Sequence, residues 1–193
     1  LPILLFVSLA DDVLENETLW FDEAILRSIH SLATPWLDTV VRAATDLGYV
    51  WWVGFLAIIT FALCIRANKY RDALIVLVGV GGSAVINLLL KALFQRDRPQ
   101  LWERIVTENS HSFPSGHAMA SASIAIVLIV ILWPTKWRWW ALSGGLLYMI
   151  IIALTRLYLG VHYPTDIVAG WVMTFLWVMI AAAVIKNWKF KKT

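Results

Sequence analysis

The chain has 193 residues, of which 60% are hydrophobic and 15% are charged, whereas soluble domains carry roughly 25% charged residues. This composition argues against a soluble protein and predicts one multi-pass membrane domain over residues 1–193. With Cys64 as its single cysteine, the chain has neither an intramolecular disulfide nor a metal site built from cysteines. The net charge of +3 is modest, and nothing in the composition implies a nucleic-acid partner or an obligatory protein partner.

The first 48 residues combine an apolar start with a long polar stretch. Leu1–Ala10 is interpreted as the remnant of a longer first span, and residues 11–48 predict two short amphipathic helices. The first helix has an apolar stripe of Phe21, Ile25, Ile29 and Leu32, with Asp22, Glu23 and Arg27 opposite. The second is predicted to begin at Thr34-Pro35, a capping hydroxyl followed by a proline, with Trp36, Val40, Ala44 and Leu47 as its apolar face. Both helices are expected at the outer membrane face, either as walls of a site or as a packed scaffold.

Five further apolar segments follow, at about Tyr49–Ile65, Ala73–Leu93, His117–Trp133, Trp139–Leu159 and Ile167–Ile185. Each is close to the roughly 17–25 residues that a helix needs to cross the hydrocarbon core. A sheet is unfavourable because its open edges cannot be satisfied in lipid. The predicted fold class is therefore all-α, an integral membrane bundle of about six transmembrane helices with short amphipathic helices on its outer face.

Lysine and arginine predict the orientation. If the spans alternate, one side holds nine basic residues and one acid, and the other side holds seven basic residues and twelve acids. The first side carries Arg66, Lys69, Arg71, Lys136, Arg138, Lys186, Lys189, Lys191 and Lys192. The positive-inside rule makes this side and the C-terminus cytoplasmic in the cell membrane, so that the opposite side faces outward. A membrane-binding tail is the alternative interpretation of the last lysines.

Three cations lie near outward ends of spans or in outward loops: Lys91, Arg98 and Arg156. A cation at this depth needs a partner or a function. The arginine fork matches phosphate oxygens, and lysine adds a movable point charge, so the trio could hold a phosphoryl group and stabilise its transition state. Each cation alone is typical of headgroup anchoring, but the trio beside histidines favours phosphate binding. Arg96 and Arg104 are interpreted as solvated residues or headgroup contacts.

A second cluster is Pro114-Ser115-Gly116-His117, at the start of a span. Ser115 could cap the helix, so that its hydroxyl and the free backbone N–H groups point at an anion. Gly116 allows the backbone to approach closely. His117 would then stand beside the bound phosphate, which favours a role as general acid over that of a surface histidine.

The third cluster surrounds a turn between two spans. Gly160 suits a helix stop, and Pro164-Thr165 suits the next helix start. If His162 lies in the turn, Asp166 can accept a hydrogen bond from one of its ring nitrogens, which leaves the other as an oriented nucleophile. Alone, Asp166 is more typical of helix-dipole stabilisation. No spacing typical of metal ligands occurs among His111, His117, His162 and Asp166, so no metal is expected.

At these residues the chain resembles the type-2 phosphatidic acid phosphatase family. That family is marked by a lysine, six residues and Arg-Pro; by Pro-Ser-Gly-His; and by Ser-Arg, five residues, a histidine, three residues and an aspartate. The matching motifs here occupy residues 91–99, 114–117 and 155–166, which makes 91–166 the catalytic region. Thr155, in place of serine, is the one departure, and it keeps the hydroxyl.

The resemblance implies a phosphatase that needs neither metal nor cofactor and forms a phosphohistidine intermediate. His162 would attack phosphorus, Asp166 would orient it, and His117 would protonate the leaving oxygen and then activate water. The phosphoryl group would be held by Lys91, Arg98, Ser115, Gly116 and Arg156.

The span count and a site at the membrane edge favour lipid phosphates over soluble ones. Phosphatidylglycerophosphate is the first expectation, with phosphatidic acid or related lipid phosphates possible. Undecaprenyl diphosphate hydrolysis and transfer to an acceptor other than water are the alternatives, and lipid binding without cleavage is a more distant one.

Overall fold

Residues 2–15 and 20–187 are described by the computed structural model, and every regular element among them is a helix. The helices are α1 (Pro2–Leu14), α2 (Trp20–His30), α3 (Pro35–Thr45), the 3-10 helix η1 (Asp46–Gly48), α4 (Val50–Arg66), α5 (Tyr70–Phe94), α6 (Gly116–Leu132), α7 (Arg138–Tyr158) and α8 (Pro164–Asn187). The all-α prediction is confirmed. The five apolar segments predicted after residue 48 correspond to α4–α8, with ends displaced by at most three residues, as at Tyr70 against Ala73.

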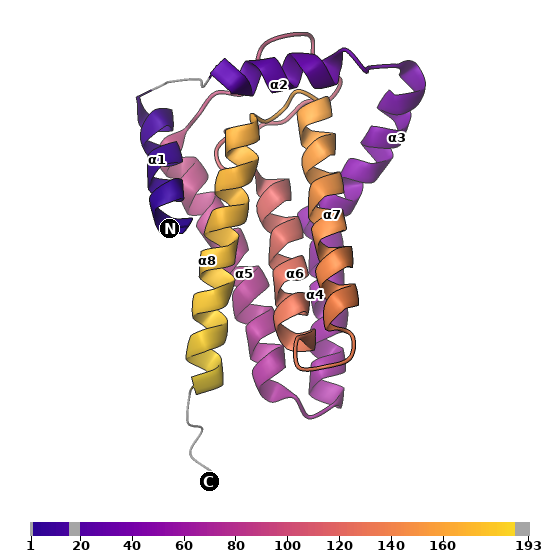
Figure 1. Ribbon diagram of the computed structural model, residues 1–193, viewed down its shortest axis with the longest axis vertical. Coiled ribbons are helices and arrows are strands. Elements are labelled where there is room, and N and C mark those ends of the chain that lie inside the picture. Colours follow the sequence, from indigo (N-terminus) through magenta and orange to yellow (C-terminus); the bar gives the residue numbers. More distant parts are fainter. Residues whose placement is uncertain (1, 16–19, 188–193) are drawn as a thin grey trace.

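The five long helices α4–α8 form an upright bundle with α6 at its centre (Figure 1), and α6 contacts each of the other four. Helix α6 is rich in alanine and serine, and small residues let neighbouring helices approach closely. Its buried side chains include Ala122 and Val127, which pack with Ile75 of α5 and Val178 of α8. The core of the bundle therefore lies around α6.

The expected count of six spans is not reached among the described residues. Three helices, α5, α7 and α8, are long and apolar enough to cross a membrane, and a fourth span results if residues 35–66, which bend by 45°, are counted as one. Helix α6 is apolar but has 17 residues. Helix α1 has 13 residues, about 20 Å at 1.5 Å per residue, so it falls short of a core about 30 Å thick. It packs instead along α8.

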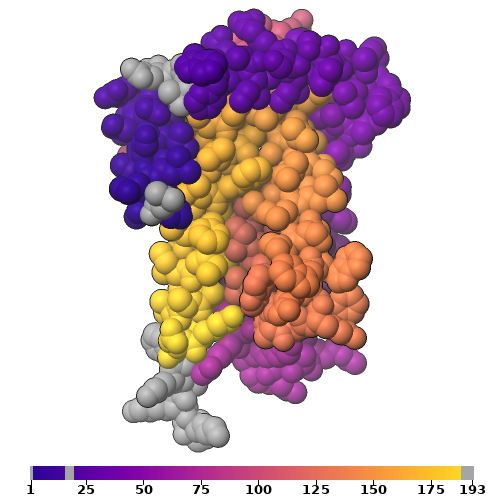
Figure 2. Space-filling model, in the orientation of Figure 1, coloured from indigo at the N-terminus to yellow at the C-terminus, as the bar shows by residue number. Residues whose placement is uncertain are grey.

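Helices α2 and α3 cover one end of the bundle, as Figure 2 shows for the indigo and violet residues. The predicted start of α3 is confirmed, because Thr34 accepts a hydrogen bond from the backbone N–H of Leu37 at 3.3 Å and Pro35 is the first helical residue. The apolar stripe predicted for α2 is not the face that packs on the bundle. Its buried residues are Asp22 and Leu26, while Ile25 and Leu32 are exposed.

The outer face of α3 is likewise apolar, since Trp36 and Val40 are exposed while Val41 and Thr45 are buried, and Leu47 of η1 is exposed as well. Both helices thus turn large apolar side chains outward, as helices lying in a membrane interface do. The physical reason is that lipid accepts apolar side chains, so an outer helix of a membrane protein need not bury its apolar stripe in the protein. Its inward face is free to carry polar groups that bond to the bundle end.

Candidate active site

The three sequence clusters meet at the bundle end beneath α2 (Figure 1). Lys91 lies in the last turn of α5, Arg156 in the last turn of α7 and His117 in the first turn of α6. The loop between α5 and α6 contributes Arg98, and the short connection between α7 and α8 contributes His162. The positions that the sequence singled out are therefore gathered from five segments of the chain.

The turn that carries His162 is set by its flanking residues. Gly160 has φ of +64°, a left-handed conformation that glycine adopts without a Cβ clash, and it ends α7 as predicted. Helix α8 then begins at Pro164. Asp166, in its first turn, accepts a hydrogen bond from the backbone N–H of Tyr163 at 2.9 Å. The aspartate side chain therefore fixes the backbone of the turn. His162, in the same turn, is 1% exposed.

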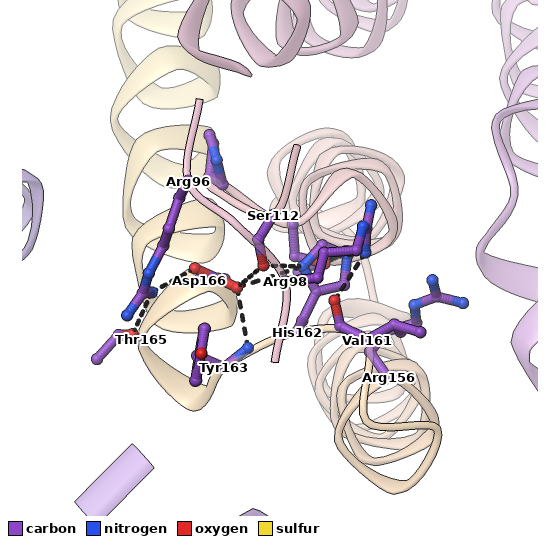
Figure 3. Close-up of polar contacts among 12 residues, drawn as sticks. Arg96, Arg98, Ser112, Arg156, Val161, His162, Tyr163, Thr165 and Asp166 are labelled. Atoms are coloured by element: carbon purple, nitrogen blue, oxygen red, sulfur yellow. Dashed lines mark hydrogen bonds and ion pairs between the residues drawn. The ribbon is translucent and has the colours of Figure 1, made fainter. Parts of the chain in front are cut away.

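The two ring nitrogens of His162 face groups of opposite charge (Figure 3). Nδ1 lies 3.4 Å from Oδ2 of Asp166, and Nε2 lies 3.2 Å from Nη1 of Arg98. Arginine can only donate, so Nε2 is the acceptor and the proton of the neutral ring is on Nδ1. Burial lowers the pKa of His162 to about 3, against the opposing effect of the hydrogen bond to Asp166, while Arg98 lowers it further. The ring is therefore neutral at physiological pH and has a lone pair on Nε2.

Arg98 is fixed by the loop that carries it and by the α7–α8 connection. Its guanidinium donates to the carbonyl oxygens of Ser110 at 2.8 Å and Val161 at 2.7 Å. Burial lowers the pKa of Arg98 to about 10, with Glu108 acting in the opposite direction, so the side chain stays charged at neutral pH. Oε2 of Glu108 lies 3.9 Å from Nη2 of Arg98, and Oε1 forms an ion pair with Arg156.

Arg156 is 1% exposed and donates to Oγ1 of Thr45 at 2.9 Å. Its Nε has no hydrogen-bond partner although it is buried. Thr155, the one departure from the family motif, bonds to the carbonyl oxygen of Ile152 at 2.6 Å and to Thr45 at 3.1 Å. The hydroxyl at position 155 therefore connects α7 to α3, and Thr45 in turn holds Arg156.

The start of α6 contributes the remaining groups. Ser115 caps the helix, as predicted, by accepting a hydrogen bond from the backbone N–H of Ala118 at 3.4 Å. The ring of His117 lies edge-on to Tyr49 at 4.5 Å between centroids, and its buried Nε2 has no partner. Lys91 donates a hydrogen bond to the carbonyl oxygen of His111. His117 thus has an unsatisfied nitrogen that could exchange a proton with a bound molecule.

One cavity of about 610 Å³ connects these groups with the interior of the bundle. Its polar end is lined by Lys91, Arg98, Glu108, Gly116, His117 and His162. It continues between α4, α5 and α6, where Val53, Val80, Ala84 and Leu88 line it. Ser115, Arg156 and Asp166 do not line the cavity. Such a space offers a charged end for an anion and an apolar path for a hydrocarbon chain.

Sequence reasoning gave no site role to three residues that the structure brings to the site. Ser112 donates a hydrogen bond to Asp166, Glu108 pairs with two arginines, and Asp22 pairs with Arg96 at 3.4 Å. The interpretation of Arg96 as solvated is wrong, because its side chain is 9% exposed and its Nη1 lies 2.6 Å from Oδ1 of Asp166. No motif or spacing in the sequence marks these positions, so only the fold reveals these contacts. Across residues 2–15 and 20–187, no group of three or more His, Cys, Asp or Glu side chains is placed to hold a metal ion.

Comparison with known proteins identifies the family of the chain. The PAP2 superfamily matches residues 72–190. Phosphatidylglycerophosphatase B of Bacillus subtilis is 31% identical over 180 residues, which cover 90% of this chain and 87% of that protein. An undecaprenyl-diphosphatase of Sulfolobus acidocaldarius is 36% identical over 63 residues, 33% of this chain and 28% of that protein.

A crystal structure described as a transmembrane PAP2-type phosphatidylglycerolphosphate phosphatase from Bacillus subtilis superposes with a TM-score of 0.84 at 26% identity, over 99% of this chain and 98% of the other. The chain belongs to the PAP2 superfamily. It is a multi-pass membrane lipid phosphatase of that type and acts on lipid phosphates.

Proposed function

We propose that this protein removes the terminal phosphate of phosphatidylglycerophosphate through a phosphohistidine intermediate on His162, with phosphatidic acid and related lipid phosphates as further substrates. The observation that carries the proposal is the placement of His162, which lines the cavity with its Nε2 beside Arg98 while its Nδ1 faces Asp166. A neutral, oriented imidazole is a competent nucleophile without a metal ion. The full-length similarity to a phosphatidylglycerophosphatase supports the choice of lipid.

In the first half-reaction, Nε2 of His162 attacks phosphorus, and the bond between phosphorus and the ester oxygen breaks. His117 gives its proton to that oxygen, so phosphatidylglycerol leaves with a hydroxyl group in place of an alkoxide. The ring of His162 then carries phosphorus on Nε2 and its proton on Nδ1, and Asp166 stabilises the resulting positive charge. In the second half-reaction, His117 removes a proton from water and the water oxygen attacks phosphorus. The bond between phosphorus and Nε2 breaks, inorganic phosphate leaves, and His162 returns to its neutral form.

Charge on the transferred phosphoryl group is stabilised by Lys91, Arg98 and Arg156 together with Ser115 and the backbone at Gly116. Arg98 and Lys91 line the polar end of the cavity, and the buried Nε of Arg156 has no hydrogen-bond partner. Ser115 and Gly116 form the N-terminus of α6, where free N–H groups favour an anion. Donors fixed in a low-dielectric site stabilise developing charge strongly.

The apolar part of the cavity supports a lipid in place of a soluble phosphate. Below the charged end it lies between α4, α5 and α6, at residues such as Val53 and Leu88. A lipid whose phosphate sits at Arg98 could therefore keep its chains among the helices. These walls do not distinguish acyl from prenyl chains. The preference for phosphatidylglycerophosphate over undecaprenyl diphosphate rests on similarity along 90% of the chain against 33%.

We infer that the site faces outward and that the C-terminus is cytoplasmic. The connection between α4 and α5, the connection between α6 and α7 and the end of α8 all lie at the bundle end opposite the site (Figure 1). Arg66, Lys69, Arg71, Lys136, Arg138 and Lys186 are found there, and the positive-inside rule places such loops in the cytoplasm. Lys189, Lys191 and Lys192, which the sequence argument also counted, lie outside the described residues.

The test is phosphate release by purified protein in detergent with a metal chelator present. Phosphatidylglycerophosphate, phosphatidic acid and undecaprenyl diphosphate are offered side by side, with His162→Ala as the control. Release that survives the chelator and disappears in folded His162→Ala supports the histidine mechanism, and the order of kcat/KM names the substrate. Preference for undecaprenyl diphosphate would replace the proposed lipid, and consumption of lipid without free phosphate would indicate a transferase.

A further inference from the structure

A single guanidinium joins the outer helix α2 to the proposed active site. Arg96 Nη1 lies 2.6 Å from Oδ1 of Asp166, and Arg96 Nη2 lies 3.4 Å from Oδ2 of Asp22. Both carboxylates are completely buried. Arg96 therefore bridges an aspartate of the catalytic motif and an aspartate 144 positions earlier in the chain (166 − 22).

Thr165 ties the same two segments together a second time. Its backbone N–H donates to Oδ1 of Asp22 at 3.1 Å, and its hydroxyl donates to Oδ2 at 2.7 Å. The Arg96 Nη1 group also donates to the Thr165 hydroxyl at 2.9 Å, and its guanidinium lies over the ring of Tyr163, 4.2 Å from the centroid. Asp22 is thus held from one side by the first turn of α8 and from the other by Arg96.

This arrangement divides the oxygens of Asp166 between two tasks. Oδ1 accepts from Arg96, while Oδ2 faces Nδ1 of His162 and accepts from Ser112 and from the backbone N–H of Tyr163. With Oδ1 fixed, the carboxylate cannot rotate away from the imidazole. A shift of an ångström in an orienting group is enough to slow a reaction strongly.

The charge balance gives Asp22 a second effect. A cation paired with Asp166 alone would cancel the negative charge that stabilises a cationic phosphohistidine ring. Asp22 supplies a second carboxylate to Arg96, so the three groups together keep one net negative charge beside His162. Burial raises the pKa of Asp22, and the hydrogen bonds from Thr165 and the charge of Arg96 act against that effect.

We propose that Asp22 is a positioning residue for the reaction: through Arg96 and Thr165 it holds the carboxylate of Asp166 against His162, which makes α2 a working part of the active site. The inference rests on the proposed phosphohistidine mechanism and extends it to a helix outside the catalytic motifs. No contact of Asp22 with the cavity is involved, since Asp22 does not line it.

The competing explanation is that Asp22 serves only to dock α2 on the bundle. Leu26 of the same helix separates the docking role from the positioning role. It is completely buried against Ala118, Ala153 and Ile167, and it is not among the charged groups that link α2 to His162. Leu26→Ala weakens docking by opening a cavity. Asp22→Asn keeps the shape and removes the charge. Glu23→Gln removes an exposed carboxylate from the next position and serves as a charge control.

The experiment measures kcat, KM, orthovanadate inhibition and melting temperature for these three variants and for Arg96→Lys, whose single ammonium cannot bridge both carboxylates. We expect Asp22→Asn and Arg96→Lys to lower kcat by roughly tenfold, the loss usual for groups that hold a reacting residue, with KM and the vanadate constant within about twofold of wild type. Leu26→Ala should lower the melting temperature, but its kcat, measured below that temperature, should equal that of wild type. Glu23→Gln should change neither the melting temperature nor kcat.

Folded Asp22→Asn with wild-type kcat would overturn the inference. The inference would also fail if Asp22→Asn and Leu26→Ala had the same melting temperature and the same loss of kcat, because weaker docking of α2 would then explain both losses. If Asp22→Asn does not fold, folded Arg96→Lys decides in the same way. A wild-type protein that releases no phosphate from any lipid would overturn the proposed function and this inference together. If the wild type is active and Asp22→Asn has the same kcat, only the inference is overturned.

Discussion

Glu108 forms an ion pair with Arg156, and its other carboxylate oxygen lies 3.9 Å from Nη2 of Arg98. Two of the three cations proposed to bind phosphate therefore share one carboxylate. Carboxylate and phosphate oxygens use the same guanidinium donors. A phosphate bound by both arginines must displace Glu108 or share its donors, so Glu108 sets a cost for anion binding.

Replacing Glu108 with glutamine should strengthen anion binding. The side chain is 17% exposed, and loss of a partly buried competing charge worth about 1 kcal/mol corresponds to roughly a fivefold lower inhibition constant for orthovanadate. The measurement is vanadate inhibition of phosphate release. Glu103→Gln, an exposed acid of the same loop, is the matched control. An unchanged or higher inhibition constant for Glu108→Gln would show that the carboxylate does not compete with the phosphoryl group.

Asp166→Asn should lower kcat far more than it changes KM. An asparagine amide can turn its N–H group towards Nδ1 of His162, which then favours the proton on Nε2, the nitrogen proposed to attack. A change of this kind in a serine protease triad costs roughly 10⁴-fold in kcat. The measurement is steady-state kinetics on phosphatidylglycerophosphate. The control is Asp97→Asn, an exposed carboxylate in the loop that carries Arg98. A change confined to KM would contradict an orienting role for Asp166.

The helices of the bundle could be predicted from sequence because the thickness of a bilayer fixes the length of an apolar segment. The ends of α4 and α7 fall within one residue of prediction for that reason. The inward face of α2 could not be predicted in this way. Hydrophobic periodicity marks the apolar side of a helix, and in a membrane protein that side can face lipid as well as the core, as Ile25 does here.

Some residues of the site could be predicted from sequence motifs, and others could not. Lys91, His117 and His162 belong to motifs with fixed internal spacing, and the fold places them around one cavity. Asp22 and Glu108 reach the same site from α2 and from the loop before α6, where nothing in the local sequence marks them. Their contacts depend on how distant segments pack, and spacing along the chain carries no information about that.

The stability of the fold should fall as the pH drops below neutral, partly because of His162. Burial lowers its pKa from the ordinary value of 6.5 to about 3 in the folded protein. Between these two values the unfolded chain binds a proton at this position that the folded protein excludes, so acid favours unfolding. The effect is absent above about pH 6.5 and is complete near pH 3.

The measurement is melting temperature in detergent between pH 7 and pH 4 for wild type and for His162→Gln. Wild type should lose more stability over this range than the variant, since glutamine binds no proton. Glu23→Gln, which leaves the site unchanged, should follow the wild-type curve. Parallel curves for wild type and His162→Gln would mean that the folded protein binds the proton as readily as the unfolded chain does.

Gly48 packs closely against Ile152 and the ring of His117. A Cβ at this position would lie 2.7 Å from Cγ2 of Ile152 and 3.0 Å from Cδ2 of His117, so one of these side chains has to move. Gly48→Ala should therefore lower kcat/KM on lipid phosphate by roughly tenfold, as small displacements of a reacting group do. It should also lower the melting temperature, because overpacking costs about 1–3 kcal/mol.

Gly144→Ala, in α7, is the matched control, since no heavy atom lies within 4 Å of its added Cβ and Gly144 does not line the cavity. Because alanine suits a helix better than glycine does, this variant should keep its activity and be as stable as wild type or more so. 4-Nitrophenyl phosphate sharpens the test: its acidic phenol departs without a proton, so the first half-reaction needs no acid from His117. The defect of Gly48→Ala in kcat/KM should shrink with that substrate. An equal defect with both substrates would show that Gly48→Ala acts through some other part of the site.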